Sequence, residues 1–180
     1  MSYKLQKPFT GKQYADFIVE HNHNNGLKIE ETDSAVYALE PDEIMQDGQP
    51  VKNPHYASEQ LEIAKSFKLE ENKQKRDAYL VGGIEYKGVI FDSDTDSKVN
   101  IMGALSTLAD DAAVGWNSMD NETVILTKAE LAQLADLLIQ MTSNVWGEQG
   151  LNITYINAVN AAQTLEELDS IIIEYPGAQE

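Results

Sequence analysis

The chain has 180 residues, of which 42% are hydrophobic and 24% charged, which is ordinary usage for one globular domain or two small ones. Thirteen basic residues against 30 acidic ones give a formal charge of −17, so phosphate backbones and anionic lipid are repelled. We therefore expect neither nucleic acid nor a membrane as a partner, and the absence of cysteine excludes disulfides, thiolate zinc sites and a cysteine nucleophile.

The first residues predict a small α+β module over 1–54. Thr10 and Gln13 have the spacing of a capping box, and Gly26 follows an asparagine cluster where a left-handed helix end is expected. From residue 27 to 52 the pattern favours two or three antiparallel strands packed on that helix, with a hairpin turn at Asp47-Gly48.

Residues 55–80 are predicted to form a connecting helix. Asn53-Pro54 resembles a helix start, and Leu61, Ala64 and Phe67 fall on one expected face. The following stretch, EENKQKRD, contains no apolar residue, which is typical of a helix that bridges modules through solvent. A coiled coil is the alternative, although the apolar positions do not persist for three heptads.

Residues 81–180 predict a second α+β domain with helices and short hairpins. Hairpin turns are expected at Lys87-Gly88 and Asp120-Asn121, and Thr127 with Glu130 forms a second capping box. Apolar residues at spacings of three and four then predict a buried helical face: Leu131, Leu134, Leu138, Met141 and Val145. A last helix is expected to carry Leu165, Leu168 and Ile172.

No motif in the chain points to catalysis or to a cofactor. Asp92, Asp94 and Asp96 have the spacing of a calcium loop, but the required glycine and closing glutamate are missing, so we expect a turn that caps the next helix. His21 and His23 form a possible metal pair, although they lie at an expected helix end on the surface. We therefore predict a protein that is not an enzyme and holds no metal or cofactor.

The two tryptophans, Trp116 and Trp146, have two possible roles. Each can fill a core, because an indole buries a large apolar area. Each can instead anchor an interface, where tryptophan is over-represented among the residues that dominate binding.

The order of motifs in the second half resembles a known family. Residues 82–92 read GGIEYKGVIFD, residues 93–105 read SDTDSKVNIMGAL, and a strand pair containing Trp116 precedes residues 126–131, LTKAEL. Over residues 70–175 this is similar to a small C-terminal domain of unknown function in many bacteriophage tail proteins, often labelled tail fibre assembly proteins or tail fibre components.

The resemblance implies a protein–protein role, with phage tail or fibre proteins as partners, and transfers no active-site residue. We expect a structural component of the virion tail, made in the host cytoplasm. The alternatives are a tail fibre assembly chaperone and a host-expressed binding or regulatory protein of prophage origin. Tail components are usually symmetric homo-oligomers, and Ile171, Ile172 and Ile173 are a possible self-complementary surface or part of a terminal helix buried on two sides.

Overall fold

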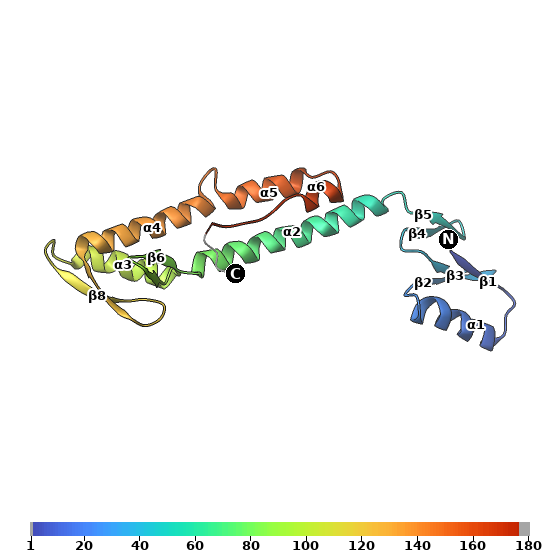
Figure 1. Ribbon diagram of the computed structural model, residues 1–180. Helices are drawn as coiled ribbons and strands as arrows, with labels where there is room; N and C mark the ends of the chain where they lie inside the picture. Colours follow the sequence, from blue (N-terminus) through green and yellow to red (C-terminus); the bar gives the residue numbers. More distant parts are fainter. Residues whose placement is uncertain (1, 177–180) are drawn as a thin grey trace. The chain divides into compact units, whose positions relative to one another are not determined.

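The computed structural model describes residues 2–176 and combines helices with antiparallel strands, so the predicted α+β class is confirmed. The chain divides into two compact units, residues 1–60 and residues 61–180. Figure 1 shows the elements of each unit. Within the described residues, no helix has the length and apolar content needed to cross a membrane.

Unit 1 is built around a three-stranded antiparallel sheet in the order β1 (Tyr3–Gln6), β3 (Ala35–Leu39), β2 (Lys28–Glu31). All five residues of the central strand are buried. A separate hairpin joins β4 (Glu43–Gln46) to β5 (Gln49–Lys52). The expected strands therefore form, but the sheet also takes in β1, which precedes the first helix.

Local signals at the ends of elements in unit 1 are confirmed. Thr10 and Gln13 form the reciprocal capping box of α1 (Gly11–Ile18), which continues into a π-helical turn, η1 (Val19–His23). Gly26 has a φ of 68°, and the amide of the next residue, Leu27, donates a hydrogen bond to the carbonyl of His21. The Asp47-Gly48 turn has positive φ at both residues, as a tight hairpin requires.

Helix α2 (Tyr56–Val81) begins in unit 1 and lies mostly in unit 2. Leu61 and Ala64 pack against the cluster around Val159, and Asn72 within the polar stretch is only 2% exposed. The expectation of a solvent-bridging linker is thus corrected. Phe67 was expected to share the packed face, but it is 72% exposed, because it lies about 120° from Leu61 around the helix.

The remaining elements of unit 2 follow the predicted order. The hairpin β6 (Ile84–Tyr86)–β7 (Val89–Phe91) leads to α3 (Thr95–Thr107), and the hairpin β8 (Ala113–Asn117)–β9 (Thr123–Thr127) leads to α4 (Lys128–Trp146). Two shorter helices complete it, α5 (Leu151–Ala161) and α6 (Leu165–Asp169). The predicted buried face of α4 is confirmed, because Leu131, Leu134, Leu138, Met141 and Val145 are all buried.

After α6, which Ser170 caps, residues 171–175 run as an extended segment beside α2 and α5 (Figure 1). The expectation that the last helix carries Ile172 is wrong, because α6 ends at Asp169. Extended residues alternate sides, so Ile173 is 1% exposed whereas Ile172 is 71% exposed. Tyr175 is buried and its hydroxyl donates to Asn72 Oδ1 at 2.8 Å.

Candidate interaction surface

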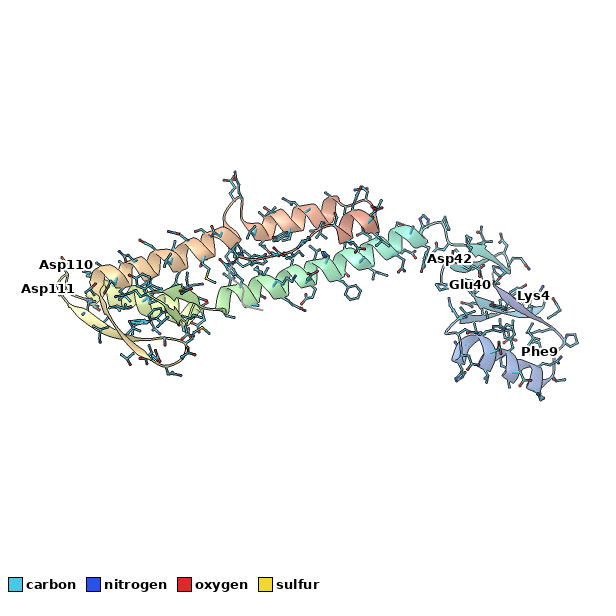
Figure 2. All side chains as sticks on the ribbon, in the orientation of Figure 1. Lys4, Phe9, Glu40, Asp42, Asp110 and Asp111 are labelled. Carbon is cyan, nitrogen blue, oxygen red and sulfur yellow. The ribbon has the colours of Figure 1, made fainter. Side chains whose placement is uncertain are left out.

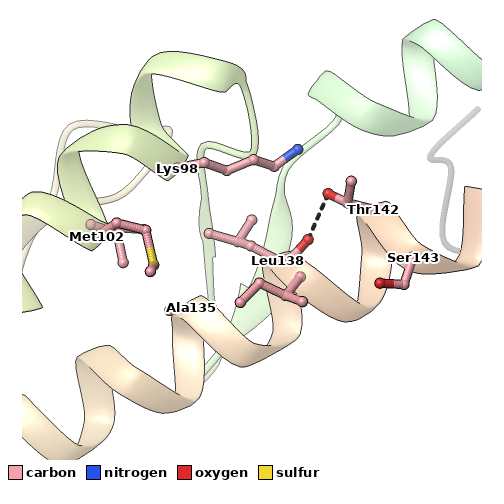
Figure 3. A pocket seen from close by; sticks show the side chains of 8 residues that line it. Lys98, Met102, Ala135, Leu138, Thr142 and Ser143 are labelled. Carbon is pink, nitrogen blue, oxygen red and sulfur yellow. Dashed lines mark hydrogen bonds between the residues drawn. The ribbon is translucent and has the colours of Figure 1, made fainter. Parts of the chain in front are cut away.

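An apolar groove lies between α3 and α4 on unit 2. Both helices are capped at their N-termini. The Asp94 side chain accepts a hydrogen bond from the Ser97 amide at the start of α3, and Thr127 with Glu130 forms the capping box of α4. The groove has a volume of about 260 Å³ (Figure 3). It is lined by residues of those two helices: Lys98, Ile101, Met102, Ala135, Leu138, Ile139, Thr142 and Ser143.

The floor and the edges of the groove differ in exposure. Ile101 and Leu138, at 1% and 2% exposed, form a floor that belongs to the core. Met102 on α3 and Ile139 on α4 form the edges, and they are 54% and 52% exposed. Large apolar side chains on both edges of a groove are typical of a surface that receives an amphipathic helix.

Lys98 supplies the only positive charge among the residues that line this groove. Burial lowers the pKa of the Lys98 ammonium from its ordinary value, and the carboxylate of Asp94 offsets only part of that effect. Figure 3 shows Lys98 opposite Thr142, whose hydroxyl donates to the carbonyl of Leu138 at 2.8 Å. A partner that brings a carboxylate to this end would restore favourable charge pairing for a partly desolvated ammonium.

A second, more polar hollow of about 450 Å³ adjoins the groove and shares Lys98 and Thr142 with it. Trp146 lies beside it, 53% exposed, with the guanidinium of Arg76 4.8 Å from the indole centroid. Arg76 also pairs with Asp77 at 2.7 Å. The indole is therefore held in place by a cation–π contact while half of its surface stays accessible.

The rest of the second half presents mostly acidic groups. Residues 98–180 contain only two cations, Lys98 and Lys128, against twelve carboxylates. Lys128 pairs with Asp110 at 2.7 Å, and Asp110 with its neighbour Asp111 extends from the loop after α3 (Figure 2). Such a field favours approach by a basic partner, and Lys98 stands out within it.

The predicted interface residues occupy three different environments. Trp146 lies next to the groove, whereas Trp116 on β8 is half-buried against the core around Leu131. Ile171 and Ile173 pack into the cluster around Tyr79, and only Ile172 is exposed. The structure therefore does not bring the five residues together into one surface.

Sequence reasoning missed Met102, Ile139 and Lys98 as a group. Ile139 falls outside the regular core spacing of α4, which is set by its buried residues Leu131, Leu134, Leu138, Met141 and Val145. An apolar residue out of register with a buried stripe is the signal that identifies such an edge.

Of the two histidines of the possible metal pair, His21 packs within unit 1, whereas His23 is exposed. The His21 ring stacks on Tyr3 with centroids 4.2 Å apart and meets Phe17 edge-on at 4.5 Å. Within residues 2–176 no group of three or more potential ligands is placed to hold a metal ion. The Asp92–Asp96 turn has the predicted role, since Asp94 caps α3.

Unit 2 is thus an α+β domain whose helix pair α3–α4 leaves an apolar groove open. Residues 63–169, more than half of the chain, match the family described as "Domain of unknown function (DUF4376)", and the chain belongs to that family. The matched residues lie within unit 2 and contain the whole groove. Comparison with curated proteins and with solved structures gives no match.

Proposed function

We propose that this protein is a non-enzymatic structural component of a bacteriophage tail, in the fibre or baseplate region, that acts through protein–protein contacts. The observation that carries the proposal is the α3–α4 groove, whose edges expose Met102 and Ile139 over a buried apolar floor. Exposed apolar side chains around a groove gain most from being covered by another protein.

The phage-tail setting rests on the resemblance of residues 70–175 to domains in tail fibre and tail fibre assembly proteins. The family description itself assigns no function. The charge of −17 suits such a setting, because it keeps the free chain soluble and steers it toward basic surfaces on neighbouring tail proteins.

A tail fibre assembly chaperone is the second candidate. The acidic second half favours this role, because residues 98–180 contain twelve carboxylates and two cations. Such an excess of negative charge can screen a partner's basic surface before assembly. A structural component stays in the mature particle at a fixed ratio, whereas a chaperone leaves.

Quantitative peptide mass spectrometry on purified, nuclease-treated particles separates the two candidates. Peptides from both units at a fixed ratio to the major tail protein support the structural role. Abundance in infected-cell lysate with absence from particles favours the chaperone. Absence from both contradicts the phage-tail setting altogether.

The same experiment with variants tests the groove. We expect Ile139→Asp to fold normally, because the side chain is 52% exposed, and to be lost from particles. Ile125→Asp on β9 is the matched control, since Ile125 is 64% exposed and lies outside the groove. Equal incorporation of both variants would contradict the groove as the site of attachment.

A further inference from the structure

Unit 2 carries a second exposed apolar feature, on the outer side of α2. Ile63 is 49% exposed and Phe67, one turn later, is 72% exposed. Glu70 follows Phe67 by three residues, so the three side chains lie along one stripe of the helix. We call this stripe the α2 ridge: Ile63, Phe67 and Glu70.

The α2 ridge matches the α3–α4 groove in size and chemistry. An apolar cavity of about 150 Å³ holds a benzene ring, so a groove of about 260 Å³ has room for the ring of Phe67 and part of Ile63. The groove offers apolar walls at Met102 and Ile139, which are the surfaces that such side chains bury.

Charge complements this fit. Lys98 stands at one end of the groove, where burial disfavours its ammonium. The ridge ends in the carboxylate of Glu70, which lies 3.8 Å from Lys73 Nζ on the same helix. A helix that lies along the groove with its Glu70 end toward Lys98 brings this carboxylate to the ammonium.

The overall charge of α2 also permits contact between copies. The helix contains five cations and five carboxylates, a balance of zero in a chain of charge −17. A second copy therefore presents a charge-balanced helix to the groove, whereas most of the acidic second half would be repelled.

A ridge cannot occupy the groove of its own chain. Along α2 the rise from Phe67 to Val81 is about 21 Å at 1.5 Å per residue, and the helix is continuous. Val81, the last residue of α2, lines the hollow that adjoins the groove. Helix α3, which forms one side of the groove, lies beyond that end of α2 (Figure 1). The ridge and the groove of one unit 2 thus face different neighbours.

We propose that copies of this chain associate head to tail, with the α2 ridge of one copy in the α3–α4 groove of the next. This inference rests on the proposed function, in that it takes protein–protein contact as the role of the groove. Because the two surfaces differ, the contact is heterologous, and repeated use of it produces a closed ring or an open filament.

Mixing two complementary variants tests this arrangement. Phe67→Asp removes the ridge and leaves the groove, while Ile139→Asp does the reverse; both residues are exposed, and circular dichroism with thermal melting verifies that each variant folds. By sedimentation velocity, we expect the wild-type chain to assemble and each variant alone to weaken assembly by about 30-fold or more.

An equimolar mixture of the two variants still contains one intact ridge and one intact groove. We expect it to form a one-to-one dimer of about 40 kDa, twice the 20.0 kDa chain, and nothing larger. Ile125→Asp, the matched control, assembles as the wild type does.

Failure of the mixture to dimerise overturns the head-to-tail contact. A symmetric α2–α2 interface would be lost in Phe67→Asp alone and would leave Ile139→Asp able to pair with itself, without any need for the other variant. A wild-type chain that remains monomeric up to about 100 μM also overturns the head-to-tail contact. That result does not decide the proposed function, which the mass spectrometry of particles tests separately. Conversely, rescue in the mixture with absence from particles upholds this contact and contradicts the role as a structural component of the tail.

Discussion

The crevice between α2 and α5 and the groove between α3 and α4 are both formed by pairs of helices, but the chain fills only the first. Residues 171–175 lie beside α2 and α5, with Tyr155 donating to the carbonyl of Glu174 at 2.7 Å and Lys75 donating to that of Ile173 at 3.0 Å. In the α3–α4 groove, by contrast, Met102 and Ile139 at the edges are more than half exposed. The chain thus covers the apolar side chains between α2 and α5 itself and leaves Met102 and Ile139 exposed.

Removing the isoleucine that fills the first crevice should have the largest effect on folding. Ile173 is 1% exposed among Tyr79, Met141 and Val145, so Ile173→Ala leaves a cavity and should reduce the free energy of unfolding by about 2–5 kcal/mol. Ile172→Ala, at a residue 71% exposed, should change it by less than about 0.5 kcal/mol. Urea denaturation measures both, and equal losses would contradict the alternating burial of this segment.

The polar contacts inside the first crevice should matter next. Asn72 donates to Asn152 Oδ1 at 3.1 Å and accepts from the Tyr175 hydroxyl. Asn72→Ala therefore leaves the buried Tyr175 hydroxyl without its acceptor, whereas Asn152 Oδ1 keeps its bond from the Arg76 guanidinium at 3.3 Å. We expect a loss of about 1–3 kcal/mol in the free energy of unfolding. Combining it with Tyr175→Phe should cost less than the sum of the two single changes, as a double-mutant cycle would reveal. Strict additivity would argue against the contact.

Trp146, in the hollow that adjoins the α3–α4 groove, should contribute less to the free energy of unfolding than these buried residues. Trp146 is 53% exposed and packs on Arg76, so Trp146→Ala should cost about 0.5–1 kcal/mol in the free energy of unfolding. If the indole also anchors a partner, assembly should weaken by about 2 kcal/mol in the same variant. A large fall in melting temperature with unchanged assembly would instead assign Trp146 to the core.

The smallest expected effect concerns pH at the start of α4. Lys87 and the Thr127 cap lower the pKa of Glu130 from 4.5 to about 2. Because folding lowers this pKa, the ionised Glu130 side chain contributes to the free energy of unfolding above about pH 4.5, and this contribution is lost as the pH falls toward 2. Glu130→Gln should remove this part of the acid sensitivity of thermal melting, and an unchanged pH profile would contradict the pairing.

Much of the local structure was predictable, because its causes lie within a few residues. The capping boxes at Thr10 and Thr127 and the turn at Lys87-Gly88 each depend on side chains or positive φ values at fixed spacing. The buried stripe of α4 follows from the helical period alone.

The features that sequence reasoning missed depend on distant residues. Strand β1 pairs with β3, about thirty residues further along the chain, and nothing near Tyr3–Gln6 signals that pairing. The groove joins Met102 and Ile139 from separate helices. The exposure of Phe67 depends on which face of α2 the C-terminal helices cover, and that is decided by tertiary packing.

Site-directed crosslinking tests the central claim most directly, because the chain contains no cysteine of its own. Ser66 lies next to Phe67 on α2 and Ser143 lines the groove, and both serines are exposed. Each is replaced by cysteine in a separate chain, Ser66→Cys and Ser143→Cys. Chains carrying one substitution each are mixed and treated with a short bismaleimide, and Ser34→Cys in unit 1 replaces either partner as the control. We predict a crosslinked dimer that contains one chain of each kind. A product formed only between identical chains, or equally well with the control, would contradict the contact between ridge and groove.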